Sequence, residues 1–133
     1  MILLDSDVMI DLLRQFPPAV EWFDSLSDDE EIALPGFVVM ELIQGCKNKV
    51  EQGKVRGALA DCDVIWPAVS DCDDALEDFA QYRLSHNAGL LDVLIGRTAV
   101  GLGMPLHTFN QKHYNFIAGL QTVQPYVKTK STP

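Results

Sequence analysis

Short apolar segments, each about as long as one buried strand, alternate along this chain with longer segments of helical pattern. This alternation restricts the fold more than any other feature of the sequence. The strand-like segments span residues 2–4, 32–34, 64–66 and 106–108, and a short edge strand is expected at 122–123. Strands joined through helices run parallel in one sheet. The sequence therefore predicts an α/β fold, a three-layer α/β/α sandwich around a central, mostly parallel sheet of four to five strands.

Helical segments fill the intervals between these strands. They are expected at about residues 8–13, 18–25, 37–44, 49–60, 70–86 and 91–100, with a shorter helix at 111–116. Ser70 and Asp73 have the spacing of a capping box and are expected to open the longest helix. A chain of 133 residues has the usual size of one domain. We expect a single domain over residues 1–127 and a loose tail over 128–133.

The start of the chain lacks the basic and apolar regions of a secretory signal. There is also no uncharged apolar run of about 18 residues, the length that a membrane-spanning helix needs. The cysteines, Cys46, Cys62 and Cys72, have neither a redox-pair nor a zinc-site spacing. We therefore expect a cytoplasmic protein with reduced thiols and no membrane contact.

Asp5 directly follows the first apolar strand. In open α/β sheets, ligands bind outside the carboxyl ends of the strands, which is where Asp5 is expected to lie. An Asp at this position also commonly caps the helix that follows, and taken alone this is its more frequent role.

Glu41 and Asp92 lie in helical segments whose neighbours are almost all apolar, so both carboxylates are expected to be largely buried. No Lys or Arg lies three or four positions away from either acid, and Arg97 is five residues beyond Asp92. A buried carboxylate needs a metal ion or a cation from elsewhere in the chain. If the two helices pack near Asp5, the three acids require a divalent cation. Oxygen ligands of this kind suit Mg²⁺ or Mn²⁺.

Four stretches of the sequence resemble the signature blocks of the PIN-domain family, in particular its VapC-type toxins, the ribonucleases of VapBC toxin–antitoxin pairs. The stretches are residues 2–10, 39–45, 91–99 and 106–114. They occur in the family's order and with compatible spacing over about residues 1–125. A single block would be weak, whereas four in order are fairly specific.

The resemblance implies an endoribonuclease that depends on Mg²⁺ or Mn²⁺ and has Asp5, Glu41 and Asp92 as catalytic, metal-binding acids. It implies the toxin of a type II toxin–antitoxin system that hydrolyses phosphodiester bonds of RNA, with transfer or ribosomal RNA as the expected target. It also implies a homodimer and a cognate VapB-type antitoxin that blocks the acidic site.

Four further residues are secondary candidates for this site. Relatives commonly have an acid, or sometimes Asn, at the position of Asn110, and Ser or Thr at the position of Thr108. Because Asn110 is neutral, a second metal ion is expected to be held more weakly. Asp7 can supply part of the missing charge or cap the first helix. Ser6 can hydrogen-bond a metal ligand or phosphate, or act as a cap.

The formal net charge of -9 disfavours a polyanionic substrate, because nucleic-acid affinity comes mainly from Lys and Arg at phosphates. Bound divalent cations reverse the local sign of a carboxylate cluster, and an acidic surface also suits a basic protein partner. One short segment is rich in basic residues, namely Lys47, Lys49, Lys54 and Arg56. We hypothesise that it holds the RNA backbone, although such a run is more often a solvated helix face.

Two other functions remain open on the sequence alone. Asp5 and Asp7 after an apolar strand also suggest the start of a haloacid-dehalogenase-like phosphatase, in which the first Asp is phosphorylated. That interpretation leaves Glu41 and Asp92 unexplained. The other possibility is a catalytically weak PIN-like binding module, for which the neutral Asn110 would be the sign.

Overall fold

The structure, a computed structural model, describes residues 1–128, and residues 129–133 of the predicted tail lie outside the described part. Within it, five strands form one sheet in the order β3-β2-β1-β4-β5, and every neighbouring pair is parallel. The predicted α/β fold is confirmed, with a sheet that is parallel throughout. The strands are β1 (Ile2–Leu4), β2 (Ile32–Pro35), β3 (Asp63–Ile65), β4 (Leu106–His107) and β5 (Thr122–Val123).

The predicted helices are present with small differences at their ends. They are α1 (Ser6–Leu13), α2 (Pro17–Asp24), α3 (Gly36–Gln44), α4 (Lys49–Ala58), α5 (Val69–His86) and α6 (Leu90–Leu102). The expected helix at 111–116 is a single 3-10 turn, η1 (Gln111–His113). The predicted capping box of Ser70 and Asp73 is wrong. Ala68 is the extended N-cap residue, and its N–H donates to Asp71 Oδ2 at 3.0 Å.

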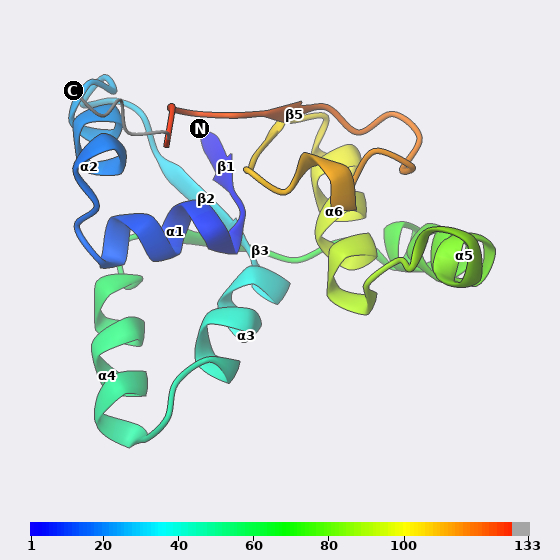
Figure 1. The fold of residues 1–133 in the computed structure, drawn as a ribbon, viewed down its shortest axis with the longest axis horizontal. Coiled ribbons are helices and arrows are strands. Elements are labelled where there is room, and N and C mark those ends of the chain that lie inside the picture. The colour runs from blue at the N-terminus through cyan, green and yellow to red at the C-terminus, as the bar shows by residue number, and fades with distance from the viewer. Residues whose placement is uncertain (129–133) are drawn as a thin grey trace.

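The order of the strands reverses at β1, and a ligand site is expected at such a reversal. The chain runs outward from β1 through β2 to β3 and then returns past β1 to β4. Right-handed crossovers put the helices of these two paths on opposite faces of the sheet. In Figure 1, α1, α2 and α4 lie to the left of the strands, and α5 and α6 lie to the right. A crevice is expected outside the carboxyl end of β1, where the two paths diverge.

The core lies around the central strand. Leu3 and Leu4 of β1 are fully buried, and Ala33, Leu34 and Leu106 of the flanking strands are buried with them. A parallel strand covered on both faces requires such an uninterrupted apolar run. Helix α3 contacts both α1 and α6, so it joins the two helical layers below the carboxyl end of β1 (Figure 1).

A second, smaller cluster of buried apolar residues attaches α5 to α6 through Ala75, Ala88 and Val93. Next to it, Arg97 Nε donates to Asp78 Oδ2 at 2.6 Å and Arg97 Nη2 donates to Asp78 Oδ1 at 3.0 Å. This bidentate pair joins the two helices. Arg97, the basic residue nearest to Asp92 in the sequence, is therefore paired with Asp78.

Two further observations concern the environment of the protein. The three cysteines are free and partly buried. Among residues 1–128, no helix combines the length and the apolar character that crossing a membrane requires.

Candidate metal centre

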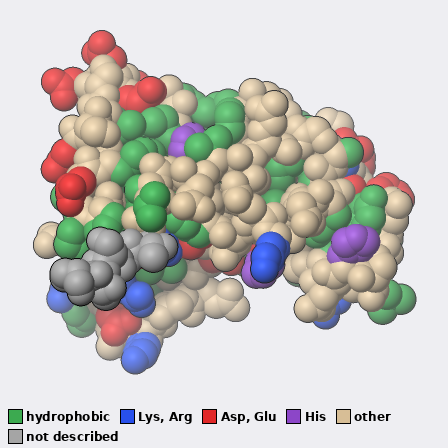
Figure 2. Space-filling view, turned by 45° about the horizontal axis from the view of Figure 1, so that its top comes forward, with side chains coloured by type: hydrophobic (Ala, Val, Ile, Leu, Met, Phe, Trp, Pro, Cys, Tyr) green, Lys and Arg blue, Asp and Glu red, His purple; other side chains and the backbone are tan. Residues whose placement is uncertain are grey.

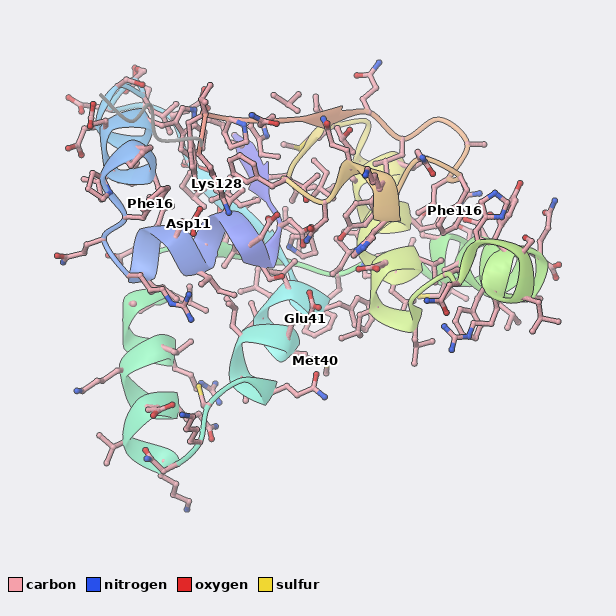
Figure 3. All side chains as sticks on the ribbon, in the orientation of Figure 1. Asp11, Phe16, Met40, Glu41, Phe116 and Lys128 are labelled. Atoms are coloured by element: carbon pink, nitrogen blue, oxygen red, sulfur yellow. The ribbon has the colours of Figure 1, made fainter. Side chains whose placement is uncertain are left out.

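Carboxylates from three elements approach one another at the carboxyl end of β1. Asp5 directly follows β1 and is the N-cap of α1, Glu41 lies on α3, and Asp92 lies in the first turn of α6. Figure 3 shows Glu41 on α3, beneath the junction of β1 and α1. The three charges are near enough to affect one another, since Asp5 and Asp92 both raise the pKa of Glu41.

Asp5 is the most buried of the three acids, with 2% of its surface exposed. Its Oδ1 accepts a hydrogen bond from the N–H of Ser6 at 2.7 Å, which confirms the helix-capping role. Its Oδ2 accepts from Thr108 Oγ1 and from the Tyr114 hydroxyl, both at 2.8 Å. Burial raises the pKa of Asp5, nearby Asp92 raises it further, and the three donors lower it, leaving the pKa above its ordinary value. Capping therefore uses one oxygen, and the other is held toward the interior.

Asp7 connects α1 to the segment after β4. Its Oδ1 accepts from the N–H of Val8 at 2.7 Å, and its Oδ2 accepts from the N–H of Phe109 at 2.8 Å. Burial and the charge of Asp5 raise the pKa of Asp7. Both oxygens are thus engaged by backbone donors. Asp7 fixes the position of the segment that carries Thr108.

Glu41 and Asp92 have fewer donors than Asp5. Burial raises the pKa of both carboxyl groups, and a hydrogen bond with the Ser6 side chain lowers that of Glu41. Asp92 Oδ2 lies 3.8 Å from Nδ1 of His113, an exposed histidine that lowers the Asp92 pKa.

Lys and Arg do not compensate these charges. In the part of the chain that the structure describes, none of the three acids forms an ion pair with Lys or Arg. The alternative that Glu41 pairs with a cation remote in sequence is therefore excluded for residues 1–128. Arg97, the other candidate partner of Asp92, is paired with Asp78.

This donor set matches the chemistry of a hard divalent cation. The donors are oxygens, they are partly desolvated, and their mutual repulsion is not balanced by Lys or Arg. As the side chains stand, residues 1–128 contain no group of three or more His, Cys, Asp or Glu arranged to share a metal ion. The effect that the structure does show is electrostatic: the charges of Asp5 and Asp92 raise the pKa of Glu41.

The other predicted site residues lie farther from the acids or contact them indirectly. Asn110 is exposed, and its backbone N–H donates to Thr108 Oγ1 at 3.0 Å. The four basic residues, Lys47, Lys49, Lys54 and Arg56, are all exposed, on the segment after α3 and along α4.

Tyr114 was not among the residues predicted from the sequence, yet it is 1% exposed and donates to Asp5. A single tyrosine in a polar stretch has no periodic pattern that would show it to be buried. The one available signal was its place at the end of the block of residues 106–114.

A large apolar groove lies apart from the acids, with a volume of about 1060 Å³. Met9, Leu12 and Leu13 of α1 line it, together with Val20 and Phe23 of α2. Acidic residues also border it, namely Glu21, Glu30, Glu31, Asp61 and Asp63. On the face drawn in Figure 2, many acidic side chains gather at the left, the side on which Figure 1 shows α2.

Comparisons with known proteins, by family model and by sequence, point to the same family. The family model described as PIN domain matches residues 2–117. The sequence is 36% identical over 115 residues to "Ribonuclease VapC10" of Mycobacterium tuberculosis, and the match covers 86% of each protein.

Solved structures that share the fold include two VapBC complexes. One is VapBC2 from Rickettsia felis bound to a DNA fragment from its promoter, with a TM-score of 0.73 and 21% identity over 92% of this chain and 98% of that chain. The other is VapBC-1 from nontypeable Haemophilus influenzae, with a TM-score of 0.74 and 22% identity over 94% and 98%. At these identities the two structures support the fold alone.

Proposed function

Because this chain belongs to the PIN-domain family, we propose that it is an endoribonuclease that depends on Mg²⁺ or Mn²⁺ and hydrolyses RNA phosphodiester bonds. One observation carries the proposal: Asp5, Glu41 and Asp92 approach one another at the carboxyl end of β1 without a Lys or Arg partner in the described residues. The relative named a ribonuclease supports RNA as the substrate.

In this proposal, Asp5, Glu41 and Asp92 hold the cation. When bound, the cation supplies a water molecule of lowered pKa and neutralises charge on the phosphate. Asp5 is already oriented by its three donors, so it loses little side-chain freedom on binding. Glu41 has fewer hydrogen-bond donors than Asp5, so its carboxylate is less restricted and is suited to accept a proton from the attacking water.

We propose that one cation is held tightly. Asn110 is neutral and exposed, so it adds no charged ligand for a second ion. Asp7 accepts hydrogen bonds from the backbone that position the segment after β4.

We also propose that the chain is the toxin of a type II pair and is inhibited by a VapB-type antitoxin. The similar solved structures are VapBC complexes, and the acidic border of the apolar groove suits a basic, amphipathic segment. A gene for a small DNA-binding protein next to this one is expected. Its product should co-purify with this chain and suppress cleavage; a neighbouring product that does neither would contradict the pairing.

For the substrate, we propose a structured RNA such as transfer or ribosomal RNA. The four exposed basic residues on and before α4 follow the helix that carries Glu41, so they are available to contact the RNA backbone.

The first prediction tests the nuclease directly. The wild-type protein is expected to cut total RNA in the presence of Mn²⁺ and to lose this activity in excess EDTA. Asp5→Asn removes one charge from the proposed cation site and is expected to lower cleavage by about 100-fold or more, since even residues that only support metal ligands cost about 10–100-fold. Asp24→Asn makes the same change at an exposed position at the end of α2 and should retain full activity.

The same experiment separates the other functions. A phosphatase of the haloacid-dehalogenase type would bind beryllium fluoride at Asp5 and leave RNA intact. In that chemistry the second Asp, here Asp7, acts as a general acid and base. In this structure both Asp7 oxygens accept hydrogen bonds from backbone N–H groups. A folded protein that cuts no RNA under any metal condition would favour a binding module.

A further inference from the structure

Tyr114 is the largest fully buried side chain among residues 1–128, with 1% of its surface exposed. A buried phenol hydroxyl requires a hydrogen-bond partner. Here the hydroxyl donates to Asp5 Oδ2 at 2.8 Å. Asp92 and Glu41 are near enough that their charges also act on the phenol.

The position of the ring is fixed from behind by α6. Gly96 has no side chain, and a Cβ there would lie 2.5 Å from Ile117 Cδ1 and 3.5 Å from Tyr114 Cδ1. The segment that carries the phenol can therefore lie directly against the helix that carries Asp92. Two backbone hydrogen bonds, each 3.1 Å long, hold this segment before and after the ring. The N–H of Tyr114 donates to the carbonyl of Gln111, and the N–H of Ile117 donates to the carbonyl of Tyr114.

The phenol hydroxyl has one proton to donate, and it donates that proton to Asp5 Oδ2. Thr108 Oγ1 donates to the same oxygen at 2.8 Å, and the N–H of Ser6 donates to Asp5 Oδ1 at 2.7 Å. The Asp5 carboxylate is therefore held by three donors, and Tyr114 is the one that lies against α6, the helix that carries Asp92.

We propose that Tyr114 is a positioning residue of the acidic centre: its hydroxyl orients the Asp5 carboxylate so that Asp5 can share a divalent cation with Asp92. This inference rests on the proposed function, because it concerns the same site. It assigns Tyr114 no contact with the RNA and no step in the proton transfer.

The test removes only the hydroxyl oxygen, with Tyr114→Phe. Mn²⁺ affinity, measured from the electron paramagnetic resonance signal of free Mn²⁺, is expected to fall by about 10–100-fold, as is usual when a residue that orients metal ligands is lost. At saturating Mn²⁺, kcat for RNA cleavage should fall while KM for RNA stays unchanged.

The matched control is Tyr126→Phe. The Tyr126 hydroxyl also donates to a carboxylate, Asp11 Oδ2 at 2.7 Å, but this pair belongs to α1 and the C-terminal segment. Its loss should leave Mn²⁺ affinity within about twofold of the wild type. Thermal unfolding in EDTA shows whether each variant is folded. If Tyr114→Phe does not fold, 4-fluorophenylalanine at position 114 fills the same space without a proton to donate.

The outcomes distinguish this inference from the proposed function. Wild-type affinity for Mn²⁺ in a folded variant without the hydroxyl would overturn the inference alone and leave Tyr114 a packing residue. A wild-type protein that binds no Mn²⁺ and cuts no RNA would overturn the proposed function and the inference together.

Discussion

Glu41 shows, at the scale of one residue, how the acidic site lowers the stability of the metal-free protein. It is partly desolvated, it feels the charges of Asp5 and Asp92, and the Ser6 side chain is the donor that lowers its pKa. Such a residue destabilises the metal-free fold when it is ionised. Sites that bind ligands often retain groups of this kind, because the ligand recovers the lost stability.

This cost has a pH dependence whose sign follows from the raised pKa of Glu41. Between the unfolded and the folded pKa, the folded protein binds more protons than the unfolded chain, so the free energy of unfolding falls as pH rises. Glu41→Gln is uncharged throughout and avoids this loss. In EDTA, the Tm of Glu41→Gln relative to wild type is expected to be higher at pH 7 than at pH 4.5, by on the order of a few degrees.

Calorimetry across this pH range would check the prediction, with Glu77→Gln as an exposed control on α5. Adding Mn²⁺ at pH 7 should raise the Tm of the wild type more than that of Glu41→Gln. A Tm difference between variant and wild type that stays constant with pH would contradict the electrostatic explanation.

At the scale of elements, the start of α6 determines where Asp92 lies. Gly89 is the N-cap of this helix, and a Cβ built on it would lie 2.7 Å from Asp92 Oδ2. Its φ of -83° is accessible to any residue, so the requirement for glycine here is one of space. The bidentate pair of Arg97 and Asp78 holds the same helix against α5.

Gly89→Ala is therefore expected to displace the Asp92 carboxylate. Mn²⁺ affinity should fall by about 10-fold or more, whereas replacing the Gly cap should lower stability by at most about 1 kcal/mol. Gly53→Ala is the matched control, because nothing lies within 4 Å of a Cβ there. That control should stabilise α4 by about 0.5–1 kcal/mol and leave Mn²⁺ affinity unchanged. Unchanged Mn²⁺ affinity in Gly89→Ala would argue against Asp92 as a ligand.

At the scale of the whole molecule, the net charge of -9 opposes binding of RNA, so the proposed interface assigns the phosphate contacts to the few basic residues. Lys47 and Lys49 are exposed between the end of α3 and the first turn of α4. They follow the helix that carries Glu41, and the proposed RNA interface therefore includes them.

Lys47→Glu combined with Lys49→Glu is expected to weaken RNA binding and to reduce the slope of log affinity against log salt by about 2, since each phosphate contact contributes about 1. Binding can be measured in an Asp5→Asn background, which prevents cleavage. Arg14→Glu reverses an exposed charge at the end of α1 and serves as the control. An unchanged slope would remove these lysines from the proposed interface.

The sequence by itself determined the order of strands and helices, and it was enough to single out Glu41 and Asp92 as unusual acids. A strand buried on both faces must be apolar without interruption, so residues 2–4 could be recognised directly. Glu41 and Asp92 were notable because acids rarely occur among apolar neighbours on a helix. Both signals are local, and a linear pattern is sufficient to detect them.

Only the tertiary structure decided which side chains form hydrogen bonds with each acid. Asp5 pairs with Thr108 and Tyr114, which are 103 and 109 residues away and reach it because β4 lies parallel to β1. The expected helix at 111–116 likewise ends after one turn, and Tyr114 that follows it is turned inward. Hydrogen-bond partners depend on the register of distant strands and on side-chain direction. Neither property leaves a periodic pattern in the sequence, because each is set by the packing of the whole chain.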